Sequence, residues 1–177
     1  MAVDLDHLLE PGYLGDLRAR SMEEIRRMRA ECQEVETGLS LLRRVVQGRL
    51  DIVGVELARR AEGGDPADLP ALIAALPDVL SDRTGPSGAG RLVQLMAPGE
   101  MPGDLEAELD RIVSPGQMAD LPSQSEEELR RIGRELAELE RRVSAQRQQL
   151  FDRIDALQAE ITRRYRDGEA SVDSLLQ

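Results

Sequence analysis

Two stretches of the 177-residue sequence carry the same spaced set of carboxylate, hydroxyl, guanidinium and amide side chains. Their common pattern is E-x3-S-x2-R-x3-(Q/F)-x3-D, with Phe151 in the glutamine position of the second copy. Such groups suit a guanine nucleotide, because a carboxylate accepts hydrogen bonds from guanine N1–H and N2–H2 while arginine donates to O6 and N7 or to a phosphate. We name the nine polar members of the two copies the polar stripe: Glu36, Ser40, Arg43, Gln47, Asp51, Glu140, Ser144, Arg147 and Asp155.

The polar stripe has an ordinary alternative explanation, which is that its members form ion pairs on a solvated helix surface. Two observations favour a binding site. The serine and the arginine recur in phase in both copies, which a solvated surface does not require. In addition, segments 36–51 and 140–155 each carry a net charge of +1, although the whole chain carries −11. An anionic ligand therefore has a place that it can occupy.

The stripe lies on two predicted helices that are copies of each other. Residues 21–64 and 125–168 align without a gap at an offset of 104, with 16 identities in 44 positions. Each copy opens with a serine followed three residues later by a glutamate, which is the signature of a capping box, and each ends at a glycine. We expect long helices over 21–61 and 122–166, each about 60 Å long at 1.5 Å per residue.

Apolar residues recur at steps of three and four and form one narrow seam along each helix. The first seam comprises Ile25, Met28, Cys32, Val35, Leu39, Leu42, Val46, Leu50, Val53 and Leu57. The second comprises Leu129, Ile132, Leu136, Leu139, Val143, Gln146, Leu150, Ile154, Leu157 and Ile161. Each residue of the polar stripe directly follows a seam residue, so it lies about 100° further around the helix. A helix with a single apolar stripe must pair with the other copy, with its own copy in a dimer, or with a partner.

The remaining composition supports an all-α protein. Two tyrosines, one phenylalanine and no tryptophan leave little for a broad globular core, whereas long helices need only an aliphatic seam. Residues 1–20 are predicted to form a leader, and residues 167–177 a tail. Residues 62–121 hold seven of the nine prolines and are predicted to form a mostly mobile linker, with short helical pieces near 72–80 and 105–113.

Several function classes are disfavoured. A net charge of −11 argues against direct DNA binding and suits a basic partner such as a DNA-binding protein. The single cysteine, Cys32, forms no intrachain disulfide and is expected in the core. Neither a signal peptide nor a membrane-spanning run is recognisable, so we expect a cytoplasmic protein. No catalytic, cofactor-binding or metal-binding motif is recognisable either, which indicates that the protein is not an enzyme.

The repeated motif, on an acidic, lysine-free and arginine-rich helical chain, resembles the RsiG family of actinobacterial anti-sigma factors, which cyclic-di-GMP controls. The resemblance covers both long helices. It implies an antiparallel two-helix coiled-coil hairpin with a long, partly disordered connecting linker. It further implies that a dimer of cyclic-di-GMP binds between the helices, through all nine residues of the polar stripe, and that the loaded protein sequesters a WhiG-type sigma factor. Phe151 departs from the glutamine of the family motif.

An antiparallel hairpin would bring the two motifs to the same level, because each lies at the middle of its helix. A pseudo-two-fold axis would relate them, and cyclic-di-GMP is itself two-fold symmetric. We then expect three facing pairs: Glu36 and Asp155, Arg43 and Arg147, and Asp51 and Glu140. In this hypothesis the facing arginines repel each other in the ligand-free protein, and the nucleotide neutralises them and joins the helices into one rigid surface.

The sequence leaves two other functions open. A constitutive coiled-coil adaptor or scaffold would have the same seam and no small-molecule ligand. An enzyme subunit or allosteric regulator could use the same stripe for another guanine nucleotide, such as GTP or ppGpp. For Phe151, packing against the seam is favoured over stacking on a guanine, because large apolar residues beside a seam usually pack.

Overall fold

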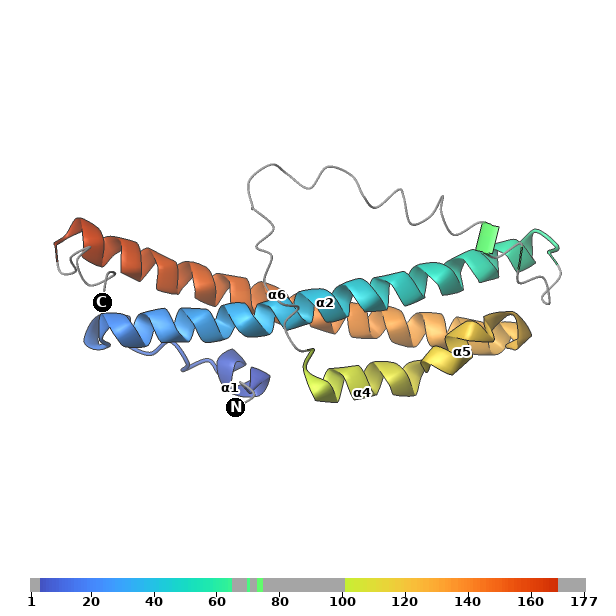
Figure 1. The fold of residues 1–177 in the computed structure, drawn as a ribbon, viewed down its shortest axis with the longest axis horizontal. Helices are drawn as coiled ribbons and strands as arrows, with labels where there is room; N and C mark the ends of the chain where they lie inside the picture. The colour runs from blue at the N-terminus through green and yellow to red at the C-terminus, as the bar shows by residue number, and fades with distance from the viewer. Residues whose placement is uncertain (1–3, 65–69, 71–72, 75–100, 169–177) are drawn as a thin grey trace.

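The computed structural model describes residues 4–64, 70, 73–74 and 101–168, and two long helices dominate it (Figure 1). Helix α2 spans Met22–Ala61 and helix α6 spans Glu126–Arg166. They run antiparallel: Arg26, near the start of α2, donates to Tyr165, near the end of α6, and Arg60, at the other end of α2, donates to the carbonyl of Gln124. The described residues contain no strand. The predicted all-α hairpin is confirmed.

The two helices begin at the predicted serines, but the two caps differ. The Ser21 hydroxyl accepts from the Glu24 amide at 3.1 Å, and the Glu24 carboxylate accepts from the Ser21 amide at 2.7 Å, which completes the capping box. The Ser125 hydroxyl accepts from the Glu128 amide at 3.2 Å, but the Glu128 carboxylate binds Arg131 instead. Helix α6 therefore begins at Glu126 with one half of the predicted box.

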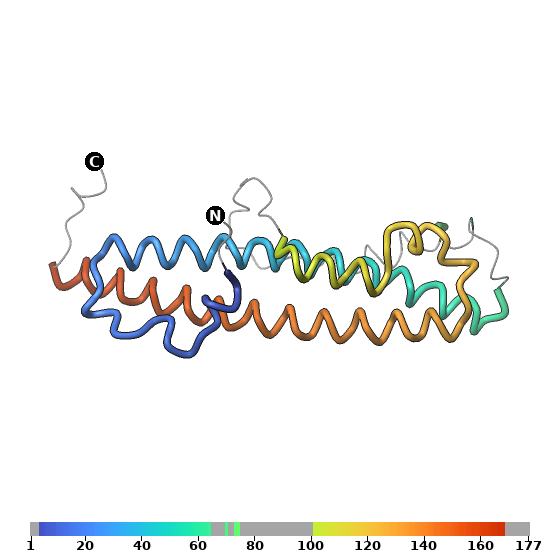
Figure 2. Tube along the Cα trace, turned by 90° about the horizontal axis from the view of Figure 1, so that it is seen from below, coloured from blue at the N-terminus to red at the C-terminus, as the bar shows by residue number. Residues whose placement is uncertain are grey.

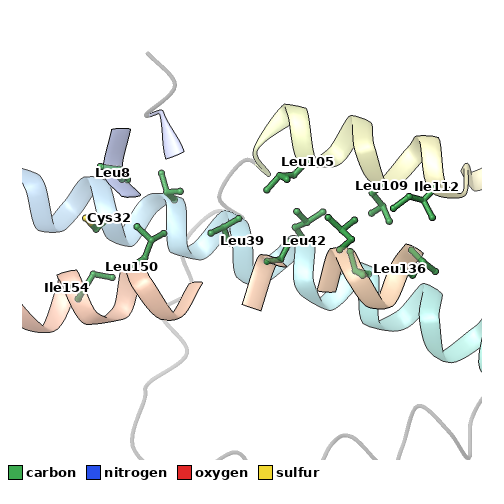
Figure 3. Packing of buried hydrophobic residues seen from close by; sticks show 14 of the residues in the cluster. Leu8, Cys32, Leu39, Leu42, Leu105, Leu109, Ile112, Leu136, Leu150 and Ile154 are labelled. Atoms are coloured by element: carbon green, nitrogen blue, oxygen red, sulfur yellow. The ribbon is translucent and has the colours of Figure 1, made fainter. Parts of the chain in front are cut away.

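The aliphatic seam forms the core between α2 and α6 (Figure 3). Of the twenty predicted seam residues, seventeen are buried. Cys32 is among them, with no exposed surface, so the prediction that it is a core residue is confirmed. Leu50, Leu57 and Gln146 are only half-buried. The half-buried Leu50 and Leu57 lie in the same half of the hairpin, so the seam is more exposed in that half than in the other.

Short elements from the leader and the linker cover one side of the hairpin (Figures 1 and 2). From the leader come α1 (Leu5–Leu9) and the 3-10 turn η1 (Leu17–Ala19). From the linker come α4 (Gly103–Ile112), α5 (Pro115–Ala119) and the 3-10 turn η2 (Leu121–Ser123).

The predicted helical piece near 105–113 is confirmed by α4, whereas the piece near 72–80 falls largely outside the described residues. Residues 101–121 of the predicted linker pack on the hairpin. Their buried leucines, Leu105, Leu109 and Leu121, belong to the same core cluster as the seam. Burial of this apolar surface holds the segment on the hairpin.

The short elements extend the duplication beyond the long helices. At the same offset of 104, η1 corresponds to η2, and each lies just before the serine that caps a long helix. Arg153 donates to the carbonyl of Leu9 at 2.7 Å, and its counterpart Arg49 donates to the carbonyl of Val113 at 2.7 Å. Each half of the protein is thus a leader followed by a long helix, and the two halves are related by a pseudo-two-fold axis.

Candidate functional site

The polar stripe lies on the side of the hairpin that α1 and α4 do not cover. Arg49 marks the covered side, because it pairs with Asp110 of α4 at 3.1 Å and also donates to the Val113 carbonyl. Arg49 is six residues after Arg43, which places it about 240° further around α2. The guanidinium groups of the two copies of the stripe therefore lie on a face that none of the described elements covers.

One half of the stripe centres on the carboxylate of Glu140. Arg43 of α2 donates through Nε to Glu140 Oε1 at 2.9 Å and to the Ser144 hydroxyl at 2.7 Å. The Gln47 amide donates to the same Glu140 oxygen at 3.1 Å, and the Ser144 hydroxyl donates to it at 3.0 Å. Four predicted residues from two helices thus meet at one carboxylate.

The other half centres on Glu36 in the corresponding way. Arg147 of α6 donates through Nε to Glu36 Oε1 at 3.0 Å, and the Ser40 hydroxyl donates to the same oxygen at 2.6 Å. At the offset of 104, Arg43 corresponds to Arg147 and Glu140 corresponds to Glu36. The interhelical ion pair therefore occurs twice, with the donor and the acceptor exchanged between the helices. This reciprocity is what the predicted pseudo-two-fold axis requires.

Phe151 accounts for the difference between the two halves. It takes the place of Gln47, and among the described residues no side-chain amide donates to Glu36 as Gln47 does to Glu140. Phe151 is half-buried and packs against the core cluster. Its ring centroid also lies 4.9 Å from the Arg147 guanidinium carbon, which is a cation–π geometry. Phe151 thus extends the seam, as predicted, and also positions the neighbouring arginine.

The two arginines keep donors free for a ligand. Both reach the facing glutamate through Nε, and their terminal amino groups make no hydrogen bond within the described part of the chain. The side chains of Arg43 and Arg147 are 35% and 24% exposed. A guanidinium held in this way still presents its Nη hydrogens, which suit a phosphate or the O6/N7 edge of guanine.

The structure corrects the predicted facing pairs. Glu36 lies against Arg147 instead of Asp155, and Glu140 lies against Arg43 and Gln47 instead of Asp51. Along the opposite helix these ion-pair partners lie seven or eight positions from the predicted ones, which is about two turns. The expected repulsion between Arg43 and Arg147 is wrong, because each guanidinium is paired with a carboxylate of the opposite helix.

The two aspartates of the stripe lie apart from these networks. Asp51 is half-buried and Asp155 is exposed, one turn beyond Gln47 and Phe151 respectively. Asp155 lines a hollow of about 490 Å³ near the end of α6, with Thr162 and Arg166 on its other walls. The structure therefore brings seven of the nine predicted residues into two hydrogen-bonded groups, and it does not bring in the aspartates.

Sequence reasoning missed two buried charged clusters that close the ends of the hairpin. At the end of α2, Glu56 is fully buried and accepts from Arg59 at 2.9 Å and from Arg60 at 2.6 Å. Arg60 continues to the carbonyls of Pro122 and Gln124, at 2.9 and 2.8 Å, in the segment that enters α6. Burial alone would raise the pKa of Glu56, but the hydrogen bonds from the two arginines outweigh it and hold that pKa below its usual value.

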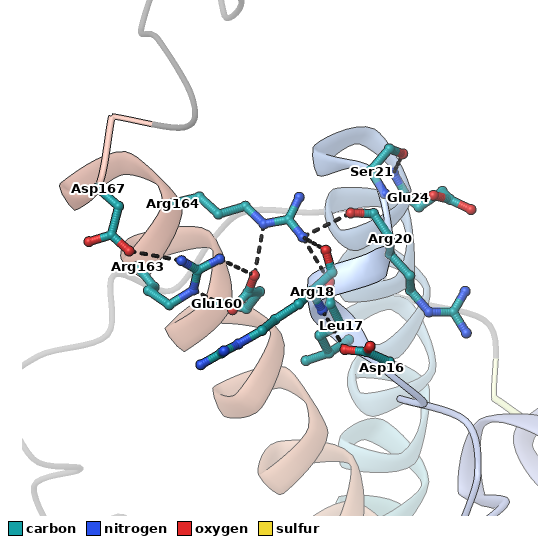
Figure 4. A network of polar contacts seen from close by, with 10 residues as sticks. All are labelled: Asp16, Leu17, Arg18, Arg20, Ser21, Glu24, Glu160, Arg163, Arg164 and Asp167. Carbon is teal, nitrogen blue, oxygen red and sulfur yellow. Dashed lines mark hydrogen bonds and ion pairs between the residues drawn. The ribbon is translucent and has the colours of Figure 1, made fainter.

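The corresponding cluster at the end of α6 contains Glu160, Arg163 and Arg164 (Figure 4). Arg164 donates to Glu160 at 2.8 Å and to the carbonyls of Leu17 and Arg20, both at 2.8 Å, in the segment that enters α2. Hydrogen bonds from Arg163 and Arg164 lower the pKa of Glu160 to about 2. No sequence signal singles out these clusters, because E-x2-R-R occurs at 56–60 and 160–164 but also at 23–27, 127–131 and 138–142.

Two other kinds of feature are absent from the described residues. They contain no group of histidine, cysteine, aspartate and glutamate side chains arranged to hold a metal ion. Within the same part of the chain, every helix is too short or too polar to cross a bilayer. The reciprocal networks of the polar stripe are therefore the arrangement that a functional account must explain.

Comparison with known proteins identifies a family. A family model described as RsiG-like matches residues 11–80 and 115–177. The two matched segments include both long helices, η1, η2 and the whole polar stripe. No curated protein matches the chain.

Proposed function

This chain belongs to the RsiG-like family, and from that premise we propose that it is an anti-sigma factor that binds a dimer of cyclic-di-GMP between α2 and α6 and, once loaded, sequesters a WhiG-type sigma factor. Membership of the family indicates the anti-sigma role and a helical regulator rather than an enzyme. The ligand and the particular sigma factor are the proposed parts.

The observation that carries the proposal is the exchange of ion pairs between the two helices. Arg43 pairs with Glu140, and Arg147 pairs with Glu36, at 2.9 and 3.0 Å. Two equivalent half-sites facing each other match a ligand whose own halves are equivalent. Cyclic-di-GMP offers two guanines and two phosphates related by such a symmetry.

Each half-site supplies the groups that a guanine nucleotide needs. The glutamate carboxylates would accept from guanine N1–H and N2–H2, and the arginine Nη groups would donate to O6 and N7 or to phosphate oxygens. The hydroxyls of Ser40 and Ser144 and the amide of Gln47 would add further hydrogen bonds. Asp51 and Asp155 would contribute at the two ends of the stripe.

Energetics permit the ligand to displace the existing contacts. Partly exposed ion pairs such as these contribute about 0–1 kcal/mol each. Micromolar binding corresponds to about −8 kcal/mol, so the loss of two such pairs leaves most of the affinity. In the ligand-free hairpin the pairs keep the arginines oriented and prevent their mutual repulsion.

Binding of cyclic-di-GMP between the helices would switch on the docking of the sigma factor. A ligand that contacts both helices favours the one arrangement in which both half-sites are in place, and it thereby shifts the population toward a single surface. The chain's net charge of −11 suits a basic, DNA-binding partner. The sigma factor would dock on this surface and be withheld from transcription.

Titration calorimetry with cyclic-di-GMP is the test of the ligand. We expect two nucleotides per chain, and loss of binding when Arg43→Ala and Arg147→Ala are combined. The matched control is Arg141→Ala, because Arg141 is 70% exposed and pairs only with Glu138 within α6. Unchanged binding by the double variant would refute the site. GTP and ppGpp as competitors would show whether another guanine nucleotide is preferred.

A constitutive coiled-coil scaffold is the second candidate, and one observation favours it. Four of the six charged residues of the stripe already pair with one another across the helices, as in an ordinary interhelical ion-pair network. The scaffold predicts that the captured sigma factor is the same with and without cyclic-di-GMP. The switch predicts capture only when the nucleotide is present.

A further inference from the structure

One end of the hairpin carries a groove beside the polar stripe. It lies between the second half of α2 and the first half of α6 and has a volume of about 340 Å³. Its lining includes Leu50, Val53, Gly54, Leu57, Gly133 and Arg134. We name it the glycine groove, after Gly54 and Gly133. Gly54 is seven residues after Gln47, and Gly133 is seven residues before Glu140. Because seven residues make about two turns, the groove continues the stripe on the same face.

The two glycines keep the groove open. A Cβ atom at Gly54 would meet no atom within 4 Å, and one at Gly133 would lie 3.7 Å from Val53 Cγ1. Close packing therefore does not require glycine at either position. The effect of the missing side chains is that Leu50 and Leu57 stay half-buried and form an accessible apolar floor.

The opposite end of the hairpin has no such floor. The counterparts of Gly54 and Gly133 are Gln158 and Arg29, and Arg29 donates a hydrogen bond to Gln158 across the two helices. Beneath them, Ile154 and Ile161, the counterparts of the two leucines, are only 8% and 6% exposed. The groove is therefore a place where the pseudo-two-fold symmetry is broken.

Positive charge stands at the edge of the groove. Arg134 is exposed and makes neither an ion pair nor a hydrogen bond with the residues that the structure describes. Its counterpart at the other end is Ala30, so this charge also breaks the symmetry. Arg130 lies beside it and pairs with Glu126 on the surface. An apolar floor with a cationic edge is complementary to apolar side chains that are flanked by carboxylates.

We propose that the glycine groove is the docking site for a helix of the sigma factor, whose apolar side chains lie on Leu50 and Leu57 and whose acidic side chains pair with Arg134 and Arg130. A channel between two antiparallel helices is suited to a third helix, which packs its side chains into the available space. This proposal rests on the proposed function, because it takes its partner from it.

The groove would also orient the partner. A two-fold ligand in a reciprocal pair of half-sites presents the same groups when it is turned end for end. A sigma factor has no such symmetry and needs a feature that distinguishes the ends. Among the described residues the glycine groove and Arg134 occur at one end only, so together with the exchange of Gln47 for Phe151 they distinguish the two orientations.

The experiment measures sigma-factor binding to the full-length chain by biolayer interferometry at saturating cyclic-di-GMP, with the WhiG-type sigma factor of the same genome as the probe. Gly54→Leu fills the groove, and Arg134→Glu reverses its edge charge. We expect each variant to weaken sigma binding by about tenfold or more, as loss of a central contact does. The matched control is Arg111→Glu on α4, on the covered side, which should leave binding unchanged.

Two further measurements keep the result decisive. Circular dichroism should show wild-type helix content for both variants, because both substituted positions face solvent. A photocrosslinking residue placed at position 54 should capture a sigma segment in which acidic residues flank apolar ones. Crosslinks to a segment without acidic residues would overturn the proposal.

The outcomes separate this proposal from the proposed function. If the wild-type chain captures the sigma factor and Gly54→Leu captures it equally well, the groove is not the docking site and the proposed function stands. If capture needs the groove but not the nucleotide, the groove proposal holds and the cyclic-di-GMP switch fails. If the wild-type chain captures no sigma factor at any nucleotide concentration, both are refuted.

Discussion

Arg43 of α2 donates to Glu140 of α6 across the hairpin, with 2.9 Å between Nε and Oε1. The residues are 97 positions apart in the sequence, and their counterparts Arg147 and Glu36 make the same contact at 3.0 Å. The contact has two roles in our account. It orients two arginines in the ligand-free hairpin, and it marks where each half of a symmetric nucleotide would bind. Exchanging the charges of residues 43 and 140 tests the two roles separately.

Charge reversal at one position should destabilise the hairpin, and reversal at both should restore it. Arg43→Glu places two carboxylates together and should lower the free energy of unfolding by about 1 kcal/mol, the scale of a partly exposed pair. Adding Glu140→Arg should recover most of that loss. Urea unfolding followed by circular dichroism measures both effects. Cyclic-di-GMP affinity should nevertheless fall at least about tenfold in the exchanged variant, since donor and acceptor have moved. Wild-type affinity there would show that these charges do not contact the ligand.

Phe151→Gln restores the motif glutamine in the second half-site. The ring packs against the core and lies under Arg147, so its loss should lower the free energy of unfolding by about 1 kcal/mol or more. Nucleotide affinity should stay within about threefold of wild type if Phe151 is a packing residue. Calorimetry on the same preparation checks this. A tenfold loss of affinity would instead assign the ring to the ligand contact.

Glu56 should be among the most sensitive charged positions in the chain. Its carboxylate is fully buried and neutralises Arg60, which in turn holds the segment that enters α6. Glu56→Gln leaves a buried guanidinium without its counter-charge and should cost about 2–4 kcal/mol of stability, measured by urea unfolding. The control Glu126→Gln removes an exposed carboxylate that pairs only on the surface, and its effect should be below about 1 kcal/mol.

Glu160 should make stability depend on pH in the acid range. Hydrogen bonds from Arg163 and Arg164 lower its pKa from 4.5 to about 2 in the folded protein. A lowered folded pKa means that the contribution is fully present above pH 4.5 and is lost as the pH falls toward 2. Urea midpoints of the wild type and of Glu160→Gln, measured from about pH 7 down to about pH 2.5, should differ at neutral pH and converge in acid. A difference that is independent of pH would contradict this assignment.

Local physical chemistry was sufficient to predict the two long helices. Helix starts follow from Ser21 and Ser125, whose hydroxyls accept from an amide in the first turn. The seam follows from the spacing of aliphatic residues, because a helix that repeats every 3.6 residues brings steps of three and four onto one face. The duplication, visible as a constant offset of 104, was sufficient to predict two equivalent half-sites. Each of these features depends on residues that are close in sequence or identical in type.

Tertiary structure decided which residues face each other. An aliphatic seam tolerates a slide by whole turns, because leucine, isoleucine and valine replace one another with little loss. The predicted alignment put Arg43 against Arg147, and the observed one puts it against Glu140. Long arginine side chains reach a carboxylate on the opposite helix, and this long-range pairing distinguishes one slide from the next.

The end clusters and the glycine groove were equally beyond local reasoning. Glu56 and Glu160 are of a residue type that usually lies at the surface. They are covered only because the segments at η2 and η1 fold back beside them. Gly54 and Gly133 are 79 positions apart, and neither indicates a groove until the two helices lie side by side. Helix formation is a local event that neighbouring residues determine, whereas charge pairing and shape arise between surfaces that meet only after the hairpin has closed.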